Sequence, residues 1–582
     1  MKHTLSYRFG HPNPQFFREN YKVLNGEWDF VFDFLDEGID KEYNKNFPTD
    51  YLKINVPFPY QAKSSLIGQD KTHCDVVWYR KKIILDNNSS HYKLTFFGVD
   101  YITFVYVNGI KVATHEGAYD SFSVDIKPFI KQGENEIVLR CLDRMHVDQI
   151  RGKQRWRDET FECFYTETSG IFKDVLLENL NDTYIDYFSF KARGFNKTLT
   201  VKVNLNEYKP NLKLHIIISL HGKEIHSSLI PLKQKEQTFN IVFDSIEYWN
   251  VSSPILYDVK LTLISNNEEV DNVLSYFGFS DVKKESKKIY INNEDTYLKL
   301  ILDQGYFENT ITSPTEEQII KDINLLKEYG FNGMRKHEKI ESPLYYYYLD
   351  LLGFYVWQEC PSGHSYSFDL AKQVKKQIVR QIDDHISHPS IIAYVIFNES
   401  WGIQGIERSK EIQQVTVDLY NIVKEKVDDR FVISNDGWEH TKSDLITFHN
   451  YASYKEDLKE SIDEGMNQIL SGNNGYCIKN GRKFYVDGFK VEDNPILITE
   501  FGGIAFSSSN ENWGYGNKVK NKEEFLERFK SQLEYIKERS EIRGWCYTQT
   551  TDVEIEVNGL FYFDRTPKFD VSDIKPLIDQ FK

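Results

Sequence analysis

The feature that most constrains the fold is an alternation of apolar strands and amphipathic helices over residues 283–582. Eight segments have the length and apolar character of buried strands: 296–302, 331–336, 353–359, 391–397, 431–435, 444–449, 495–500 and 542–548. Amphipathic helices are predicted over 316–329, 369–387, 409–428, 455–470 and 521–540, with a last helix over 570–581. Eight strand–helix units in about 300 residues are typical of a closed (β/α)8 TIM barrel.

An open, doubly wound sheet is the alternative fold for this part of the chain. It requires a glycine-rich phosphate loop after its first strand. The segment Asp303-Gln304-Gly305-Tyr306 is not such a loop. The barrel is therefore the preferred prediction.

The first 282 residues contain strands without intervening helices. Residues 1–182 include a predicted hairpin turn at Asn108-Gly109 between alternating strands, which favours a jelly-roll β-sandwich. Residues 183–282 continue with short alternating strands and have the size of an immunoglobulin-like β-sandwich. We therefore predict three domains: 1–182, 183–282 and the barrel 283–582.

Composition excludes several classes of protein. The chain has 71 Lys and Arg against 87 Asp and Glu, a net charge of −16, which disfavours nucleic acid as a partner. We find no apolar signal segment at the start and no uninterrupted apolar run of about 18 residues, so we expect a cytoplasmic protein without a membrane partner. None of the six cysteines forms a C-x-x-C pair, which argues against a zinc ribbon.

The active site of such a barrel lies at the carboxyl ends of its strands. Polar and aromatic side chains follow or end the predicted strands there. They are Asp303, Arg335, Lys336, His337, Glu359, Asn398, Glu399, Trp401, His449, Tyr451, Glu500 and Trp545.

Two of these residues, Glu399 and Glu500, come directly after strongly apolar strands. Either glutamate alone is explained by a salt bridge at the barrel rim. Together they follow strands four and seven, which lie across the barrel from each other, and glycoside hydrolysis needs such a carboxyl pair. The rings of Trp401 and Trp545 offer flat faces for a sugar, although both residues also suit an ordinary apolar core.

Five motifs in the same order resemble glycoside hydrolase family 2, which includes β-galactosidases, β-glucuronidases and β-mannosidases. The resemblance covers nearly the whole chain. The motifs are Thr168–Val175, Phe331–His337, Phe397-Asn398-Glu399-Ser400-Trp401-Gly402, Ile498-Thr499-Glu500-Phe501-Gly502-Gly503, and Gly544-Trp545 with Asn558–Lys568.

The resemblance implies retaining, two-step hydrolysis of a glycosidic bond. Glu500 would be the nucleophile, and Glu399 would act first as the acid and then as the base. Asn398 would bond the sugar 2-hydroxyl. Arg335 and Tyr451 would orient Glu500. The other residues implied to line the sugar subsite are His337, His449, Trp545, Trp401 and Asp303.

The identity of the sugar stays open at this level. The family's β-glucuronidases carry an Asn-x-Lys pair that grips the sugar carboxylate, and the matching place here reads Glu556-Val557-Asn558. A glutamate there would repel a uronate, so we expect an exo-acting β-glycosidase on a neutral hexose, with a β-galactoside favoured. A β-glucuronidase that uses Arg335 or Lys336 is the alternative, and a non-catalytic carbohydrate-binding protein is a third.

No cofactor is expected. Some family β-galactosidases bind magnesium beside the acid/base, but the segment 359–364 does not reproduce their ligand spacing clearly, so we predict no required metal. The expected partner is an oligosaccharide or another glycoside, and homo-oligomerisation stays open. The segment 151–168 is rich in Arg, Trp and Tyr. It is either a loop that contributes to the active site or a packed contact between two domains.

Overall fold

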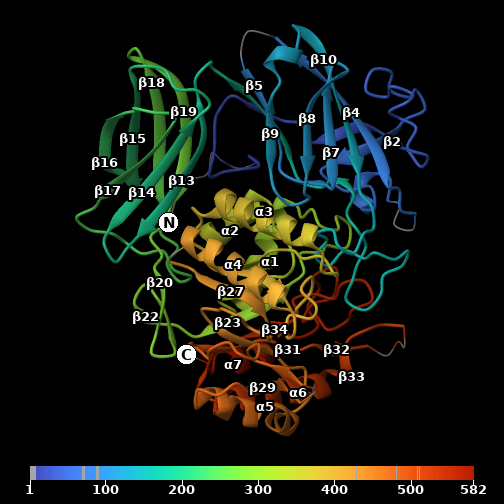
Figure 1. The fold of residues 1–582 in the computed structure, drawn as a ribbon, viewed down its shortest axis with the longest axis vertical. Helices are drawn as coiled ribbons and strands as arrows, with labels where there is room; N and C mark the ends of the chain where they lie inside the picture. Colours follow the sequence, from blue (N-terminus) through green and yellow to red (C-terminus); the bar gives the residue numbers. More distant parts are fainter. Residues whose placement is uncertain are drawn as a thin grey trace.

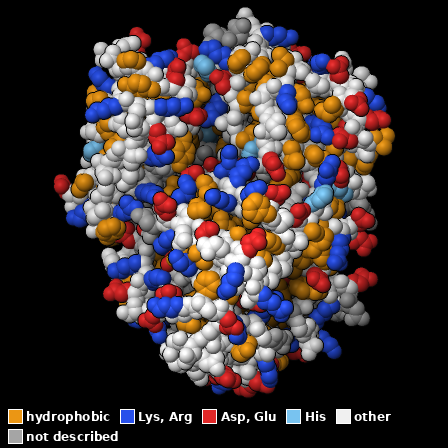
Figure 2. Space-filling view, viewed as in Figure 1, with side chains coloured by type: hydrophobic (Ala, Val, Ile, Leu, Met, Phe, Trp, Pro, Cys, Tyr) orange, Lys and Arg blue, Asp and Glu red, His pale blue; other side chains and the backbone are white. Residues whose placement is uncertain are grey.

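The computed structural model describes residues 8, 10–68, 72–86, 91–427, 429–479, 481–507, 509 and 511–581. Two β-sandwiches lie side by side at one end of the molecule, and the barrel forms the other end (Figure 1). Acidic and basic side chains are interspersed over the face shown in Figure 2. Among the described residues, none of the helices combines the length and apolar character that spanning a bilayer requires.

The N-terminal sandwich consists of two antiparallel sheets with a shared core. The four-stranded sheet has the order β1 (Tyr21–Val23), β12 (Val175–Leu180), β5 (His91–Phe96) and β9 (Phe122–Asp125). The six-stranded sheet has the order β3 (Leu52–Val56), β2 (Gly26–Phe32), β4 (Val76–Leu85), β10 (Gly133–Leu142), β7 (Ile102–Val107) and β8 (Ile110–Glu116). A short pair, β6 (Val99–Asp100) and β11 (Gly170–Ile171), lies beside them. The predicted turn is confirmed: Asn108 and Gly109 join β7 to β8, both with positive φ.

The second sandwich has a three-stranded and a four-stranded sheet. The strands are β13 (Ile185–Arg193), β14 (Thr198–Leu205) and β17 (Glu236–Val242) in one, and β16 (Lys223–Pro231), β15 (Leu212–Leu220), β18 (Tyr257–Ser265) and β19 (Glu268–Phe277) in the other. Every second residue of β14 is buried, which is the period expected of a strand with one face on a core. A small sheet of β20 (Val282–Glu285), β21 (Lys288–Ile291) and β22 (Glu294–Asp295) leads to the barrel.

Eight parallel strands form a nearly closed barrel, as predicted. In chain order they are β23 (Leu298–Asp303), β24 (Gly333–Lys336), β25 (Tyr355–Glu359), β26 (Ile391–Asn398), β27 (Phe431–Asp436), β28 (Ile446–His449), β31 (Ile496–Gly502) and β34 (Ile542–Thr548). Neighbours are hydrogen-bonded from β27 round to β28, and the ladder is open between those two strands. Strands β26 and β31 are buried over their whole length, which matches their continuous apolar sequence.

The helices cover the outside of the barrel. They are α1 (Glu316–Glu328), α2 (Pro343–Leu352), α3 (Phe368–His385), α4 (Lys410–Lys426), α5 (Lys455–Leu470), α6 (Lys522–Glu538) and α7 (Val571–Ile578). The fifth strand–helix unit differs from the prediction: residues 437–445 link β27 to β28 without a helix. Two short strand pairs, β29 (Tyr476–Ile478) with β30 (Arg482–Lys483) and β32 (Ile504–Phe506) with β33 (Tyr515–Val519), complete the barrel end.

The segment 151–168 of the N-terminal sandwich packs against the barrel. The backbone N–H groups of Arg151 and Gly152 donate hydrogen bonds of 3.1 and 2.9 Å to the carbonyl of Ser362. Gly152 has a φ of +60°, and a Cβ there would lie 2.1 Å from the Glu338 carbonyl oxygen. Only glycine therefore permits this approach of the two backbones. The ring of Trp156 stacks on His364 of the barrel at 4.3 Å.

Candidate active site

The backbone turns sharply where β26 ends, at Asn398. Glu399 has a φ of 51° and Ser400 a φ of 62°, in the left-handed region that side chains other than glycine rarely adopt. Two hydrogen bonds hold this turn: the Glu399 N–H donates to the Asp436 carbonyl and the Ser400 N–H to the Asn435 side chain, both at 2.9 Å. The neighbouring strand β27 thereby fixes the position of Glu399.

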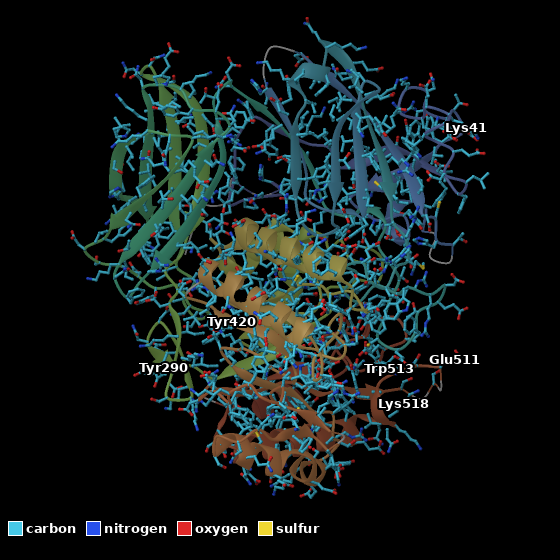
Figure 3. All side chains as sticks on the ribbon, viewed as in Figure 1. Lys41, Tyr290, Tyr420, Glu511, Trp513 and Lys518 are labelled. Carbon is cyan, nitrogen blue, oxygen red and sulfur yellow. The ribbon has the colours of Figure 1, made fainter. Side chains whose placement is uncertain are left out.

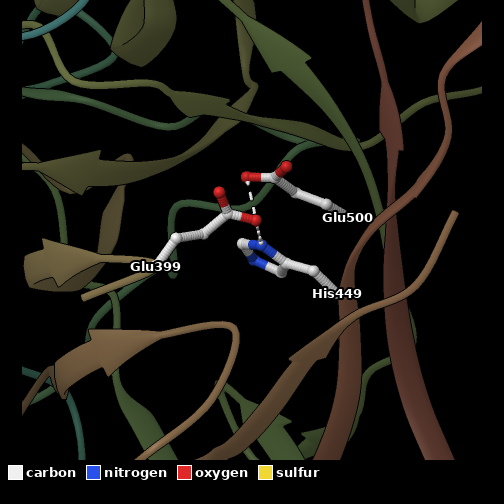
Figure 4. Close-up of side chains that lie close together, drawn as sticks. All are labelled: Glu399, His449 and Glu500. Carbon is white, nitrogen blue, oxygen red and sulfur yellow. Dashed lines mark hydrogen bonds and ion pairs between the residues drawn. The ribbon is translucent and has the colours of Figure 1, made fainter. Parts of the chain in front are cut away.

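The carboxyl groups of Glu399 and Glu500 both approach the same nitrogen of the His449 imidazole (Figure 4). Nδ1 of His449 lies 2.8 Å from a Glu399 carboxylate oxygen and 3.6 Å from a Glu500 carboxylate oxygen. One carboxylate oxygen from each glutamate and one imidazole nitrogen all lie within 4.8 Å of one another. The Glu500 side chain is 3% exposed, while that of Glu399 is 17% exposed. The two carboxyls thus meet at the carboxyl end of the barrel, and Glu399 is the more accessible.

Glu500 is held as a carboxylate by its neighbours. Burial favours its neutral acid, but His449, Arg335 and His337, together with a hydrogen bond from the Tyr451 hydroxyl, outweigh burial and lower the pKa of Glu500 to about 2. Arg335 Nη1 lies 3.2 Å from the Glu500 carboxylate. Glu500 is therefore ionised throughout the neutral and mildly acidic range.

Arg335 is the centre of a buried ion-pair network. It is fully buried and reaches four strand ends, because its guanidinium carries five donors in a fixed plane. Its described partners are Glu359 at 2.6 Å, Asp436 at 2.8 Å, Glu500 at 3.2 Å, the Asn398 side-chain oxygen at 3.2 Å and the Thr499 carbonyl at 2.5 Å. The network fixes the direction of Glu500 and Asn398 together.

Three further predicted residues lie close to the glutamates. Nδ1 of His337 is 2.8 Å from the Glu359 carboxylate, and its ring is 6.0 Å from the ring of Trp401. Trp401 is partly exposed, two residues beyond Glu399. The Nδ2 of Asn398 is buried and has no hydrogen-bond partner among the described residues. Asn398 therefore retains a free donor beside the two carboxyls.

Two predicted residues do not join this group. Trp545 is fully buried among Phe331, Phe501 and Phe581. It lies three residues before the end of β34, so its ring belongs to an aromatic core and not to the sugar-facing rim. Asp303 ends β23 as predicted, but its carboxylate is paired with Lys336 at 2.5 Å in a separate buried network.

Sequence reasoning missed Asp436 and Tyr515. Asp436 ends β27, and its Oδ2 lies 3.2 Å from His449 Nε2. The sequence could have indicated Asp436, because this residue comes after an apolar strand in the same way as Glu399. The Tyr515 ring stacks on Tyr451 at 3.6 Å and contacts Trp513, which lies at the barrel end beside β33 (Figure 3). No sequence pattern marked that segment.

The group of Glu399, His449 and Glu500 also has side-chain types that bind metals. A histidine binds a metal through an unprotonated nitrogen. Burial opposes the charged form of His449, but Glu500, Asp436 and Glu399 outweigh it and raise its pKa to about 10. Without a metal ion His449 is therefore an imidazolium at neutral pH, and a metal ion would have to displace its proton to bind this group.

Comparison with known proteins gives matches along the chain. Family models match residues 21–181 (Glycosyl hydrolases family 2, sugar binding domain), 183–279 (Glycosyl hydrolases family 2) and 281–582 (Glycosyl hydrolases family 2, TIM barrel domain). A β-galactosidase of Thermoanaerobacter pseudethanolicus is 27% identical over 394 residues, covering 65% of this chain and 52% of that protein. A β-glucuronidase of Bacteroides fragilis is 22% identical over 426 residues, covering 67% of this chain and 58% of that protein.

Among solved structures, a β-glucuronidase from Ruminococcus gnavus in complex with D-glucuronic acid has the same fold. The TM-score is 0.80 at 18% identity, with 97% of this chain and 98% of that chain covered. The chain spans about half the length of the first curated relatives it matches. The barrel model alone covers more than half of the chain, and all three models come from one family in the expected order. The chain therefore belongs to glycosyl hydrolase family 2.

Proposed function

We propose that the chain is a retaining, exo-acting β-glycosidase that removes a terminal β-linked neutral hexose, with a β-galactoside favoured. The observation that carries the proposal is the approach of Glu399 and Glu500, whose carboxylate oxygens come within 4.8 Å. Retaining enzymes hold the two carboxyl groups about 5–5.5 Å apart, whereas inverting enzymes keep them about 6.5–9.5 Å apart to admit a water. Two oxygens this close leave little room for a water between the carboxyl groups, which supports retention.

The reaction has two steps in this proposal. Glu500, kept ionised by Arg335 and His449, attacks the anomeric carbon while Glu399 gives its proton to the departing glycosidic oxygen. A covalent bond forms between Glu500 and the sugar as the bond to the aglycone breaks. Water then attacks the same carbon, Glu399 takes its proton, and the bond to Glu500 breaks. The free Nδ2 of Asn398 donates to the sugar 2-hydroxyl.

A β-glucuronidase is the second candidate, and the comparisons favour it through the Bacteroides fragilis relative and the Ruminococcus gnavus structure. Glu556 argues against it. This glutamate is buried in the loop after β34, at the place that matches the Asn-x-Lys pair of the family's β-glucuronidases, and a carboxyl there would repel a uronate. Non-catalytic sugar binding is a third candidate, and the preserved carboxyl pair argues against it.

The test is substitution of each glutamate. Glu500→Gln and Glu399→Gln are expected to lower kcat on a nitrophenyl β-galactoside by about 10³-fold or more, because each removes a group needed in the chemical step. Azide added to Glu500→Gly should restore turnover and give a glycosyl azide of inverted configuration. Glu407→Gln, at an exposed position, is the matched control. Unchanged turnover in Glu500→Gln would overturn the mechanism, and a panel of nitrophenyl glycosides decides the sugar.

A further inference from the structure

A polar cavity lies where the two β-sandwiches and the barrel meet. It has a volume of about 240 Å³ and is lined by side chains of all three domains. Strands β5, β9 and β12 form one wall, β13 of the second sandwich forms another, and the end of α3 forms a third (Figure 1). Glu399, His449 and Glu500 are not among its described lining residues. The cavity is therefore separate from the candidate active site.

Most charged side chains around the cavity already have a partner of opposite charge. The described pairs are Asp186 with Lys93 at 2.6 Å, Glu178 with Arg18 at 2.8 Å, Asp383 with Lys426 at 2.7 Å and Glu341 with Lys336 at 2.6 Å. Lys173 and Asp384 also line the cavity, and neither forms an ion pair with a group that the structure describes. Because these two charges have opposite signs, the cavity favours a ligand without net charge.

The amine of Lys173 keeps one position for a ligand. The side chain is buried, and its Nζ donates hydrogen bonds to the carbonyls of Tyr119 at 2.8 Å and Glu341 at 3.3 Å. Burial lowers the pKa of Lys173 to about 7, so that its third position carries a hydrogen in the ammonium form and a lone pair in the amine form. A hydroxyl group suits both forms, since it donates and accepts hydrogen bonds.

Asp384 and His385, at the end of α3, also have unused hydrogen-bonding capacity. The described hydrogen bonds of the Asp384 carboxyl come from Ser121 alone, whose hydroxyl lies at 3.1 Å, whereas a carboxylate accepts about four. Nδ1 of His385 is buried and has no hydrogen-bond partner among the described residues, although the residue lines the cavity and is 4% exposed. A buried polar atom without a partner is costly, and a bound hydroxyl would remove that cost.

The rest of the lining suits a sugar ring. Phe97, Tyr119 and Phe188 contribute aromatic surface, on which the C–H groups of a pyranose pack, and Thr95, Ser121 and Ser123 contribute hydroxyls. Apolar walls with a few polar groups are typical of sites for small molecules. We propose that this cavity binds a neutral monosaccharide, whose hydroxyls form hydrogen bonds with Lys173, Asp384 and His385.

Equilibrium dialysis of the whole protein against labelled D-galactose, D-glucose and D-mannose tests the proposal. Ser123→Tyr brings a large ring into the cavity from an exposed position of β9, and Thr114→Tyr, at an exposed position of β8 in the same sandwich, is the matched control. With at least one of the sugars, Ser123→Tyr is expected to bind one molecule fewer than Thr114→Tyr. Its kcat/KM on a nitrophenyl β-galactoside should stay within about twofold of the wild-type value, because distant sites act independently.

Asp384→Ala provides a second comparison that does not fill the cavity. It should weaken binding in the cavity by about tenfold or more, because a hydrogen bond to a charged group is lost, and it replaces Ser123→Tyr should that variant fail to fold. Equal numbers of bound sugars in Ser123→Tyr and Thr114→Tyr with all three sugars would overturn the inference, as would an unchanged affinity in Asp384→Ala. The outcome is independent of the proposed function, since the difference of one bound sugar is expected whether or not the protein hydrolyses a galactoside.

Discussion

At the scale of single residues, the charge state of the site is set by a few close contacts. His449 lies between Glu399, Glu500 and Asp436, and its pKa is raised to about 10. Because this pKa is raised above the ordinary histidine value of 6.5, the charged imidazolium adds to the free energy of unfolding. The added stability is fully present below pH 6.5 and is lost as the pH rises through about 10. The pKa of Glu500 is lowered instead, so its carboxylate adds to the free energy of unfolding above pH 4.5. That stability is lost as the pH falls from 4.5 toward about 2.

The Tyr451 hydroxyl, which donates to Glu500, is the simplest contact to remove. Tyr451→Phe should raise the pKa of Glu500, because one hydrogen bond to the carboxylate disappears, and should shift the acid limb of kcat/KM upward by about 1 pH unit. The measurement is a pH profile on an activated aryl glycoside. Tyr515→Phe, which keeps the ring stacked on Tyr451, is the control. If the acid limb of kcat/KM in Tyr451→Phe lay at the same pH as in the wild type, the Tyr451 hydroxyl would not be lowering the pKa of Glu500.

At the scale of elements, the sequence was most informative where one local pattern decides the structure. The helix predicted to begin at residue 316 does so, and it starts with a capping box in which Thr315 and Gln318 exchange two hydrogen bonds, a pattern that the sequence Thr-x-x-Gln already carries. The eight strands were predictable because each is an apolar run of strand length. The missing fifth helix was not, because the short link 437–445 is decided by how β27 and β28 pack.

The cap of α1 gives a prediction at this scale. Thr315→Ala removes the side-chain acceptor of the Gln318 N–H and should destabilise the barrel by about 1 kcal/mol, or about 2 °C in its thermal midpoint. Thr315→Ser keeps an oxygen in place and should change the midpoint by much less. Thermal unfolding followed by circular dichroism measures both. A Thr315→Ala midpoint equal to that of Thr315→Ser would show that the cap does not contribute.

At the scale of the whole molecule, the cavity between the three domains depends on how domains dock, which a sequence pattern does not encode. The glutamates were predictable because each directly follows an apolar run of strand length in the sequence. Lys173 and Asp384 were not, since only the packing of the domains brings them to one cavity. The prediction that Trp545 lines the sugar site was wrong for a related reason. The sequence of β34 does not show on which side of the strand the Trp545 ring lies.

Arg18 also depends on how domains pack, because its side chain pairs with carboxylates of both β-sandwiches. Its guanidinium pairs with Glu178 of β12 at 2.8 Å and with Asp271 of β19 at 2.9 Å, and it is 4% exposed. Arg18→Met would leave two buried carboxylates without their cation and should cost about 3–5 kcal/mol of stability.

Combining Arg18→Met with Glu178→Gln and Asp271→Asn removes the stranded charges and should recover much of that loss, because the penalty comes mainly from unpaired buried carboxylates. Thermal unfolding of the single and triple variants tests this, with Arg157→Met as an exposed arginine control. If the triple variant were no more stable than Arg18→Met, the loss would instead come from the packing of the arginine against Phe16, whose ring centre lies 4.7 Å from the guanidinium.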